Sequence, residues 1–398
     1  MQRVETSPRT GWQTRVEEAG LNFHTQGTKP YWDETSAYRF SHHQIEEHVS
    51  APSEELHQMC MEATQKVAAS QELMERVGIP DAYRDFVANS LQSQDPDLMG
   101  RFDLIYDGQS TPKMIEYNAD TPVTLLETCS IQWDWLQDQI STGALASGCD
   151  QRNDLFEALT ERFEQIFPQT RDIHFAALGD AQTNPEDYAA TETMAWAAHD
   201  AGHRVHFTQL DQIGIAETGQ FVDDEDQIIG SLFKLYPWED MLQDDFAVHL
   251  STAQCRYFEP PWKAITSSKG LLPILWEMFE GHPNLLPTFF ASDIDGVTRA
   301  QDLLQKGHVK KPILSRQGGS ITIFESGHIT EQSVERCFNN VPSIIQAYAP
   351  CPVISGFRPV LGSFVVDGKC VGLGIREDQS RITQDDCRFK PHFIQDTH

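Results

Sequence analysis

Two short charged stretches decide how this chain folds, and they read Arg101-Phe-Asp103-Leu-Ile-Tyr-Asp-Gly108 and Ile115-Glu116-Tyr-Asn118-Ala-Asp120. The residues between them include Gln, Ser and Pro, and Gly, Ser and Pro favour turns, so the pattern predicts a β-hairpin. If the turn centres between positions 109 and 110, Asp103 faces Glu116. Arg101 then faces Asn118. Because side chains alternate along a strand and opposed pairs lie close together, these four side chains should share one face.

That face would carry two carboxylates, one amide and one guanidinium, a set that a hydrophobic core does not select. Two facing carboxylates repel each other unless a cation lies between them. A set of oxygen ligands suits Mg²⁺, usually with phosphate completing the coordination shell. The alternative is a solvated hairpin edge, where charged side chains are common. The spacing alone leaves both interpretations open.

The composition limits the partners. The chain has 398 residues, of which 59 are acidic and 30 basic, and its formal net charge is −29. This charge argues against nucleic acid or an anionic membrane as the main partner. Solvation explains the charge, which is also compatible with a cationic substrate such as a polyamine. The length suits two or three ordinary domains or one elaborate domain.

The sequence also carries signals of location. It has no run of 18 apolar residues and no apolar signal core near Met1, so we expect neither a membrane span nor secretion. None of its eight cysteines forms a Cys-x-x-Cys pair. This usage favours the reduced thiols of a cytoplasmic protein over a disulfide framework or a zinc site.

Helix and strand patterns continue on both sides of the hairpin. We predict helices near Glu54–Val77, Asp154–Phe167 and Thr191–Gly202, and strands over 174–178 and Arg204–Gln209. A loop should hold residues 184–187. Another helix should start at Thr121, with Pro122 in its first turn, so that its free N–H groups point toward the hairpin face. The strand–helix–strand section resembles a nucleotide-binding subdomain without its glycine fingerprint.

The C-terminal third contains a second constellation of cations and glycines. Lys269 precedes a predicted helix that is rich in Leu, and Lys311 precedes Pro312, which favours an extended backbone before it. After Pro312 we predict a strand, a tight turn at Gly318 and Gly319, and a second strand. Such a turn can lay backbone N–H groups over phosphates. The alternative is an exposed hairpin turn, where Gly, Ser and Arg are ordinary.

Motifs spread along nearly the whole chain resemble the synthetase domain of the glutathionylspermidine synthase family, and they are most similar to its stand-alone bacterial acid–amine ligases. The motifs are Phe23-His24, Pro30-Tyr-Trp32, Glu55-Leu-His-Gln-Met-Cys60, Arg101-x-Asp103, Glu116-x-Asn118-Ala-Asp-Thr-Pro122, Phe233-Lys-Leu-Tyr-Pro-Trp-Glu239, Leu271-Leu-Pro-x-Leu-Trp-Glu-Met278, Lys311-Pro-Ile-x-Ser-Arg316, Gly374-Ile-Arg-Glu-Asp378 and Ile382-Thr-Gln-Asp385.

The resemblance implies a fold and a reaction. The fold is an α+β, ATP-grasp-like synthetase unit over residues 1–398. Residues 1–230 would form a pre-ATP-grasp-type α/β portion with the hairpin, and residues 231–398 the ATP-grasp-like portion with the lysines and the glycine-rich loop. The reaction is ligation of a small-molecule acid to an amine. It uses ATP and two Mg²⁺ ions, passes through an acyl phosphate, and releases ADP and phosphate.

The resemblance also implies residue roles. The implied metal ligands are Asp103, Glu116 and Asn118. The implied ATP-binding residues are Arg101, Phe102, Asp103, Lys269, Lys311, Gly318, Gln346, Ala347, Tyr348, Ala349, Arg381, Ile382 and Thr383. The implied substrate-binding residues are Thr121, Thr124, Glu186, Asp187, Arg376 and Asp385. Arg101 and Arg316 are the implied catalytic residues: Arg101 would stabilise the charge that develops during transfer, and Arg316 would lie on a mobile loop.

The chain differs from the family pattern in two respects, and two other functions also fit its sequence. Bifunctional family members carry an amidase domain before the synthetase part, so we expect no amidase activity from this chain. Ser320 stands where close relatives have Asn. The rivals are a nucleotide-binding regulatory protein with residual ATPase activity and a metal-dependent phosphohydrolase. The sequence leaves open the acid, the amine and the oligomeric state, including any use of glutathione or spermidine.

Overall fold

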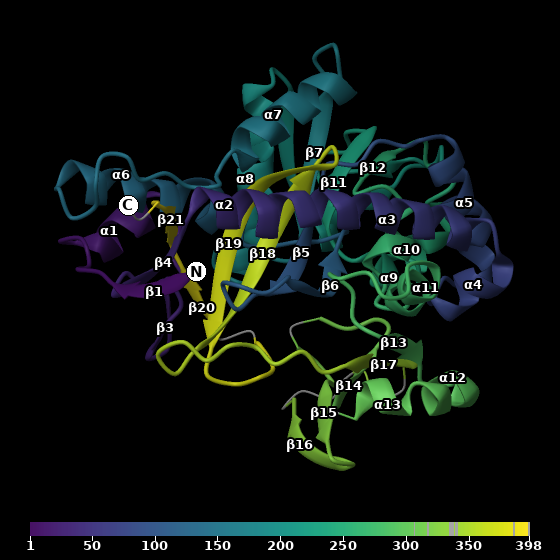
Figure 1. Cartoon of the computed structure of the whole chain (residues 1–398). Helices are drawn as coiled ribbons and strands as arrows, with labels where there is room; N and C mark the ends of the chain where they lie inside the picture. Colours follow the sequence, from purple (N-terminus) through teal and green to yellow (C-terminus); the bar gives the residue numbers. More distant parts are fainter. Residues whose placement is uncertain (306, 317, 334–337, 339–340, 385–386, 397–398) are drawn as a thin grey trace.

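The computed structural model describes residues 1–305, 307–316, 318–333, 338, 341–384 and 387–396. Within these residues the chain forms two five-stranded sheets, a four-stranded sheet, a three-stranded sheet and two short ribbons. Helices pack between and around the sheets (Figure 1). The predicted mixture of helices and sheets is therefore confirmed.

The central sheet has the strand order β20-β19-β18-β5-β6, and all its neighbours are antiparallel. Its strands are β20 (Arg388–Lys390), β19 (Lys369–Asp378), β18 (Arg358–Val366), β5 (Met99–Ile105) and β6 (Lys113–Asn118). The long helix α3 (Ala51–Ala68) lies across one face of this sheet (Figure 1). Phe102, Leu104 and Tyr117 pack into the core on that side, together with Leu56 of α3.

The β5–β6 hairpin has the predicted register. Arg101 pairs with Asn118 and Asp103 pairs with Glu116, and a bulge follows Asp103. The turn is held by the carboxylate of Asp107, which accepts the backbone N–H groups of the two residues at its tip at 2.8 and 2.7 Å. Strand alternation then gives the hairpin one apolar face toward α3 and one polar face away from it.

The second five-stranded sheet, here called the small sheet, stands apart at the bottom of Figure 1. In spatial order its strands are β13 (Thr288–Phe290), β17 (Ser343–Ala347), β14 (His308–Pro312), β15 (Thr322–Glu325) and β16 (His328–Gln332). The prediction of a strand after Pro312 was wrong, because the strand ends at this residue. Pro312 has no N–H to donate to a further ladder bond, and the next strand, β15, begins only at Thr322.

A parallel four-stranded sheet has the order β12-β11-β7-β8. Its strands are β12 (Arg256–Phe258), β11 (Ser231–Leu235), β7 (Asp172–Ala177) and β8 (Arg204–Gln209), and helices α7 (Leu155–Ile166) and α8 (Pro185–Asp200) pack beside it. The helix predicted near 154–167 and both strands are confirmed. However, α8 begins six residues earlier than predicted. Pro185 suits a first helical position, and the acidic residues that follow it favour a helix N-terminus.

Two other helix predictions need correction. The helix expected to start at Thr121 begins only at Leu125, because Thr124 has a left-handed backbone with φ of 72°. It continues through η3 (Glu127–Ile131) and α6 (Gln132–Ser141). The helix expected over 54–77 is divided into α3 and α4 (Gln71–Arg76). Ser70 causes the break by capping α4, since its hydroxyl accepts the N–H of Leu73 at 3.3 Å.

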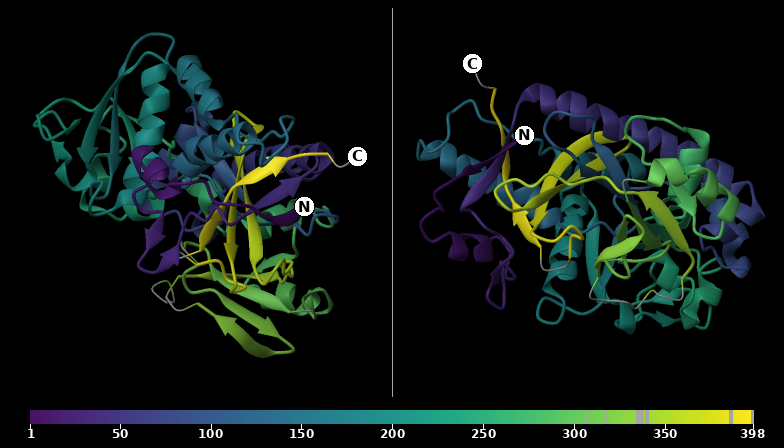
Figure 2. Two further views of the ribbon diagram at one scale, coloured as in Figure 1. Left: turned by 90° about the vertical axis from the view of Figure 1, so that its left-hand side faces the viewer. Right: turned by 60° about the horizontal axis from the view of Figure 1, so that its bottom comes forward.

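The ends of the chain meet in the three-stranded sheet. Strand β4 (Ser36–Phe40) pairs with β1 (Gln2–Glu5) on one side and with β21 (His392–Ile394) on the other, so the two terminal segments lie in one sheet with β4 between them (Figure 2). The central and parallel sheets also combine strands from both sides of residue 230. The division of the chain at that residue therefore stays a prediction.

The remaining elements are short. The ribbons consist of β2 (Thr25–Gln26), β3 (Lys29–Pro30), β9 (Gly214–Ile215) and β10 (Phe221–Val222). The other α-helices are α1 (Trp12–Glu18), α2 (His42–Ile45), α5 (Arg84–Gln92), α9 (Trp238–Met241), α10 (Lys263–Ser267), α11 (Leu271–Met278), α12 (Ile294–Arg299) and α13 (Gln301–Leu304). No helix in the described part combines the length and hydrophobicity needed to cross a bilayer. The seven described cysteines are free thiols.

Candidate active site

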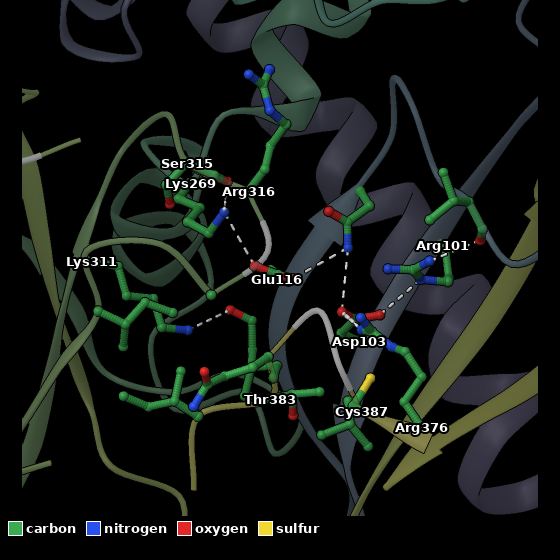
Figure 3. A pocket seen from close by; sticks show the side chains of 18 of the residues that line it. Arg101, Asp103, Glu116, Lys269, Lys311, Ser315, Arg316, Arg376, Thr383 and Cys387 are labelled. Atoms are coloured by element: carbon green, nitrogen blue, oxygen red, sulfur yellow. Dashed lines mark hydrogen bonds and ion pairs between the residues drawn. The ribbon is translucent and has the colours of Figure 1, made fainter. Parts of the chain in front are cut away.

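A cavity of about 470 Å³ lies between the central sheet and the small sheet (Figure 3). The polar face of the β5–β6 hairpin forms one wall. Strands β14, β15 and β17 form the opposite wall, and Ser315, Arg316 and Gly318, between β14 and β15, also line the cavity. The segments that follow β7 and β11 close one end. The hairpin predicted from the sequence therefore faces a cavity and not bulk solvent.

The two hairpin carboxylates converge on one point. The amide nitrogen of Asn118 lies 3.4 Å from Oδ2 of Asp103 and 3.3 Å from Oε1 of Glu116. Nε of Arg101 donates to Oδ1 of Asp103 at 2.9 Å, and Nη2 of Arg376 contacts Oδ2 at 2.5 Å. Asp103 is almost completely buried, at 1% exposure, so these cations offset the cost of burying its charge.

Two lysines reach the same wall from the other side (Figure 3). Nζ of Lys269 lies 3.2 Å from Oε2 of Glu116 and donates to the carbonyl of Ser315 at 2.7 Å. Nζ of Lys311 donates to Oε1 of Gln346 at 2.9 Å and to the carbonyl of Ile115 at 3.1 Å. Both ammonium groups are thus fixed beside the hairpin.

Electrostatic coupling shifts the pKa values of these groups. Burial alone would raise the pKa of Glu116, but Lys269 and Lys311 hold this pKa well below its usual range. Burial lowers the pKa of Lys311 to about 8, and the charge of Glu116 limits this shift. Near neutral pH the carboxylate is therefore ionised and the lysine protonated.

Together these residues form a group with a surplus of positive charge. We call it the front cluster; its members are Arg101, Asp103, Glu116, Lys269, Lys311 and Arg376. It contains four cations and two carboxylates, in a chain whose formal net charge is −29. Such a surplus, open to a cavity, favours a polyanionic ligand.

The other end of the cavity is acidic. Glu186 and Asp187 line it from the first turn of α8, and Asp240 lines it from α9. The guanidinium of Arg316 points away from the front cluster (Figure 3) and pairs with Asp240 at 2.6 Å and with Glu239 at 3.4 Å. Burial, together with the charge of Asp120, raises the pKa of Glu239. The cavity therefore has a cationic end and an acidic end.

The fold brings most of the sequence-predicted residues to this cavity. Those that line it are Arg101, Asp103, Glu116, Asn118, Thr121, Thr124, Glu186, Asp187, Lys269, Lys311, Arg316, Gly318, Gln346, Ala347, Tyr348, Ala349, Arg376, Arg381, Ile382 and Thr383. The side chain of Phe102 does not line the cavity, because it stacks on Tyr117 in the core at a centroid distance of 3.9 Å. Asp385 lies outside the described residues.

Arg381 holds part of this wall together. Its guanidinium donates to Glu325 at 2.8 Å and to Glu331 at 2.7 Å, and it lies over the ring of Tyr348. The side chain therefore ties the segment after β19 to strands β15 and β16. This contact accounts for the presence of Arg381 at the site, whether or not it touches a ligand.

Sequence reasoning missed a hydrogen-bonded pair in the cavity wall. Tyr31 lines the cavity, and its hydroxyl donates a short hydrogen bond to Glu127. Glu127 is buried, and burial raises its pKa. The sequence offered one signal for Glu127, namely its position directly after the apolar pair Leu125-Leu126. No local pattern connected it to Tyr31, which lies 96 positions earlier.

The chain was compared with families, curated proteins and solved structures. A family model described as "Glutathionylspermidine synthase preATP-grasp" matches residues 3–395. A Haemophilus influenzae protein named "Putative acid--amine ligase" is 35% identical over 373 residues, which cover 92% of this chain and 91% of that protein.

Two longer relatives are each 26% identical. They are the trypanothione synthetase of Crithidia fasciculata, matched over 94% of this chain, and the bifunctional glutathionylspermidine synthetase/amidase of Escherichia coli, matched over 88%. The matched part is 58% of the length of each relative. A solved glutathione synthetase-like effector from Globodera pallida superimposes with a TM-score of 0.58 over 98% of both chains at 11% identity, which shows a shared fold.

The family match spans nearly the whole chain and agrees with a site in which cations and carboxylates meet in a cavity between two sheets. The chain belongs to the glutathionylspermidine synthase family, and it is an enzyme of the ATP-dependent acid–amine ligase class.

Proposed function

We propose that this enzyme joins a carboxylic acid to an amine through an acyl phosphate and converts ATP to ADP and phosphate. The observation that carries the proposal is the front cluster, in which four cations surround two carboxylates at the cationic end of the cavity. Terminal phosphates of ATP and an acid substrate are the anions that such a cluster suits. The two sheets that face each other across the cavity would hold the nucleotide between them, as in an ATP-grasp fold.

The donor set fits Mg²⁺. The amide nitrogen of Asn118 lies within 3.4 Å of both hairpin carboxylates, so a rotated amide would place its oxygen beside theirs. Asp103, Glu116 and Asn118 would then hold the metal, with phosphate and water as the other ligands. Bound Mg²⁺ would neutralise part of the negative charge on the phosphates. Among the described residues, no three His, Cys, Asp or Glu side chains converge on one point, so metal binding should require the nucleotide.

The chain's own cations would perform the electrostatic work. Lys269 and Lys311 bind the phosphates, and Arg376 orients the carboxylate of the acid. That carboxylate attacks the terminal phosphorus of ATP, ADP leaves, and an acyl phosphate forms. The amine then attacks the carbonyl carbon and phosphate leaves. Arg101 stabilises the negative charge that develops on oxygen in these steps.

The attacking amine must also lose a proton. The hydrogen-bonded pair of Tyr31 and Glu127 is suited to accept it, because the hydroxyl lines the cavity and the carboxylate lies behind it. The proton would pass from the ammonium group to the tyrosine oxygen, while the tyrosine proton moves to Glu127. Burial raises the pKa of Glu127 and makes it a stronger base.

Hydroxylamine trapping combined with nucleotide analysis tests this function. Enzyme, Mg²⁺ and ATP are incubated with pools of carboxylic acids and with hydroxylamine, which converts an acyl phosphate to a hydroxamate that forms a coloured complex with Fe³⁺. We expect hydroxamate with one acid class and equal amounts of ADP. AMP as the main product would contradict the acyl phosphate. ADP release that no acid stimulates would favour the phosphohydrolase or the regulatory protein. The predicted cytoplasmic location and the absence of amidase activity stay predictions.

A further inference from the structure

A second, smaller cavity adjoins the acidic end of the candidate active site. Its volume is about 160 Å³, and we call it the apolar annex. Its wall includes Ile213, Phe221, Met241 and Phe246. Leu178 and Tyr236 line both the annex and the main cavity. The two cavities therefore adjoin at these two side chains.

The annex lies where the parallel sheet presents the carboxyl ends of its strands. Leu178 directly follows β7, Tyr236 directly follows β11, and Leu210 directly follows β8. In open sheets with parallel strands, ligands bind in the crevice outside these strand ends. The topology thus supports a ligand-binding role for the annex independently of the front cluster.

The annex leaves apolar surface accessible beside the site. Leu178 is 46% exposed and Phe246 is 40% exposed, although their neighbours Ile213, Phe221 and Met241 are buried. An engineered apolar cavity of similar volume, about 150 Å³, binds benzene. A ring or a short alkyl chain would therefore fill the annex and cover the two exposed side chains.

Charge indicates which substrate enters from this side. Asp240 lines the main cavity beside Tyr236, and Asp244 accepts the hydroxyl of Tyr236 at 3.3 Å at the annex wall. Asp211 is the second carboxylate of the annex wall. The cation that faces these carboxylates is Arg316, which pairs with Asp240. Carboxylates therefore predominate here, and the cations that suit an acid or a phosphate lie in the front cluster at the other end.

We propose that the apolar annex binds an apolar segment of the amine substrate, so that the enzyme prefers a primary amine bearing a ring or alkyl chain over a small or purely polyamine substrate. This inference rests on the proposed ligase function for its description of the ligand as the amine. The ammonium group lies at the acidic end, and the apolar segment extends past Leu178 and Tyr236.

Calorimetry tests the preference directly. The enzyme is saturated with Mg²⁺ and a non-hydrolysable ATP analogue and is titrated with 2-phenylethylamine, ethylamine or spermidine. We expect 2-phenylethylamine to bind at least about tenfold more tightly than ethylamine, because burial of its ring removes apolar area from water. Phe246→Gln should remove most of this difference, and its unfolding temperature shows whether the fold is kept.

A matched control lies on the same short 3₁₀ turn, η5 (Asp245–His249). Val248 is 67% exposed and does not line the annex, so Val248→Gln should bind both amines as the wild type does. Equal affinities of the wild type for 2-phenylethylamine and ethylamine would overturn the annex proposal. Tighter binding of spermidine than of 2-phenylethylamine, or an unchanged preference in a folded Phe246→Gln variant, would also overturn it.

Hydroxylamine separates this proposal from the function on which it rests. It is too small to reach the annex, so hydroxamate formation by the wild type tests the acyl phosphate alone. If no acid gives a hydroxamate, the ligase function fails, whatever the calorimetry shows. If hydroxamate forms and the amines show no preference for a ring, the ligase function stands and the annex proposal fails.

Discussion

Two groups of buried charge flank strand β5, and they differ in how their charges are balanced. The front cluster opens into the cavity and has four cations for two carboxylates. The rear cluster, defined here as Asp97, Arg162, Glu259, Lys263 and the exposed Asp367, lies at the start of the same strand. Its Glu259 accepts the backbone N–H groups of Leu98 and Met99, each at 3.0 Å.

Carboxylates outnumber cations in and around the rear cluster. Lys263 contacts Asp97 at 2.8 Å and Glu259 at 3.4 Å. Arg162 contacts Asp97 at 3.2 Å and the exposed Asp367 at 3.0 Å, so three carboxylates share two cations. Burial and the nearby Asp97 raise the pKa of Glu259 to about 7, against the opposing charge of Lys263.

The comparison shows that buried charge by itself does not mark a functional site. In the rear cluster, a proton on the buried Glu259 can offset the surplus of carboxylates. In the front cluster, the surplus is positive and faces a cavity, so a ligand can offset it. The sign of the imbalance and its access to a cavity distinguish a candidate active site from a structural ion network.

The largest expected effect separates the two clusters. Asp103→Asn or Glu116→Gln should lower Mg²⁺-dependent ATP turnover by on the order of a thousandfold, because each would remove a proposed Mg²⁺ ligand from the front cluster. The matched rear-cluster variant, Glu259→Gln, should keep its turnover. Steady-state ADP release at limiting Mg²⁺ checks this, with thermal unfolding as a control for folding. Full activity of both front-cluster variants would remove the metal assignment.

A smaller effect is expected at the loop that carries Arg316. We expect this side chain to leave Asp240 and reach the reacting groups when the substrates bind, which would also help to exclude water. Arg316→Ala should then lower amide formation by about a hundredfold and change ATP affinity little. The measurements are single-turnover kinetics and nucleotide binding.

Arg204 provides a control for this loop variant. It is exposed on β8 and pairs with Asp172, far in the sequence from the loop, so Arg204→Ala should behave as the wild type does. An unchanged rate in Arg316→Ala would leave a static loop with a solvated arginine as the better interpretation.

Removal of the Tyr31 hydroxyl should slow ligation in a way that depends on the amine. Tyr31→Phe should slow ligation of a primary amine by on the order of tenfold, because the protonated amine loses its acceptor. Hydroxylamine is already neutral near pH 7, so its ligation should fall much less. Rates with both acceptors across pH 6 to 9 measure the difference. An equal loss with the two acceptors would indicate a structural role only.

The smallest effect concerns stability and the rear cluster. The pKa of Glu259 is raised from 4.5 to about 7 in the folded protein, so its contribution to the free energy of unfolding is complete below about pH 4.5. That contribution is lost as the pH rises through 7. Relative to Glu259→Gln, the wild type should lose on the order of 1–3 kcal/mol between pH 5 and 8.

Urea unfolding of the two proteins at several pH values measures this difference. The front cluster titrates identically in both proteins, so its contribution cancels in the comparison. Parallel pH profiles for the wild type and Glu259→Gln would mean that Glu259 is ionised throughout, and that the rear cluster keeps its surplus of negative charge.

Local sequence patterns were enough to predict the hairpin and its polar face. Turn chemistry and strand alternation act over a few residues, so the pairing of Asp103 with Glu116 followed from local spacing. The family resemblance implied roles for half of the residues that line the cavity, including Lys269 and Lys311. The early start of α8 at Pro185 and the end of β14 at Pro312 follow from local proline chemistry that the predictions did not apply. The late helix start at Leu125 departed from the local pattern, because Thr124 has a left-handed backbone.

Which distant charges meet depends on how the elements pack in three dimensions. Arg376 contacts Asp103 across 273 positions, because β18 pairs between β5 and β19 and thereby brings the end of β19 to the hairpin. The contact of Tyr31 with Glu127 and the apolar annex have the same origin. Each depends on the packing of elements that are remote in the sequence, and local propensity carries no information about which remote elements become neighbours.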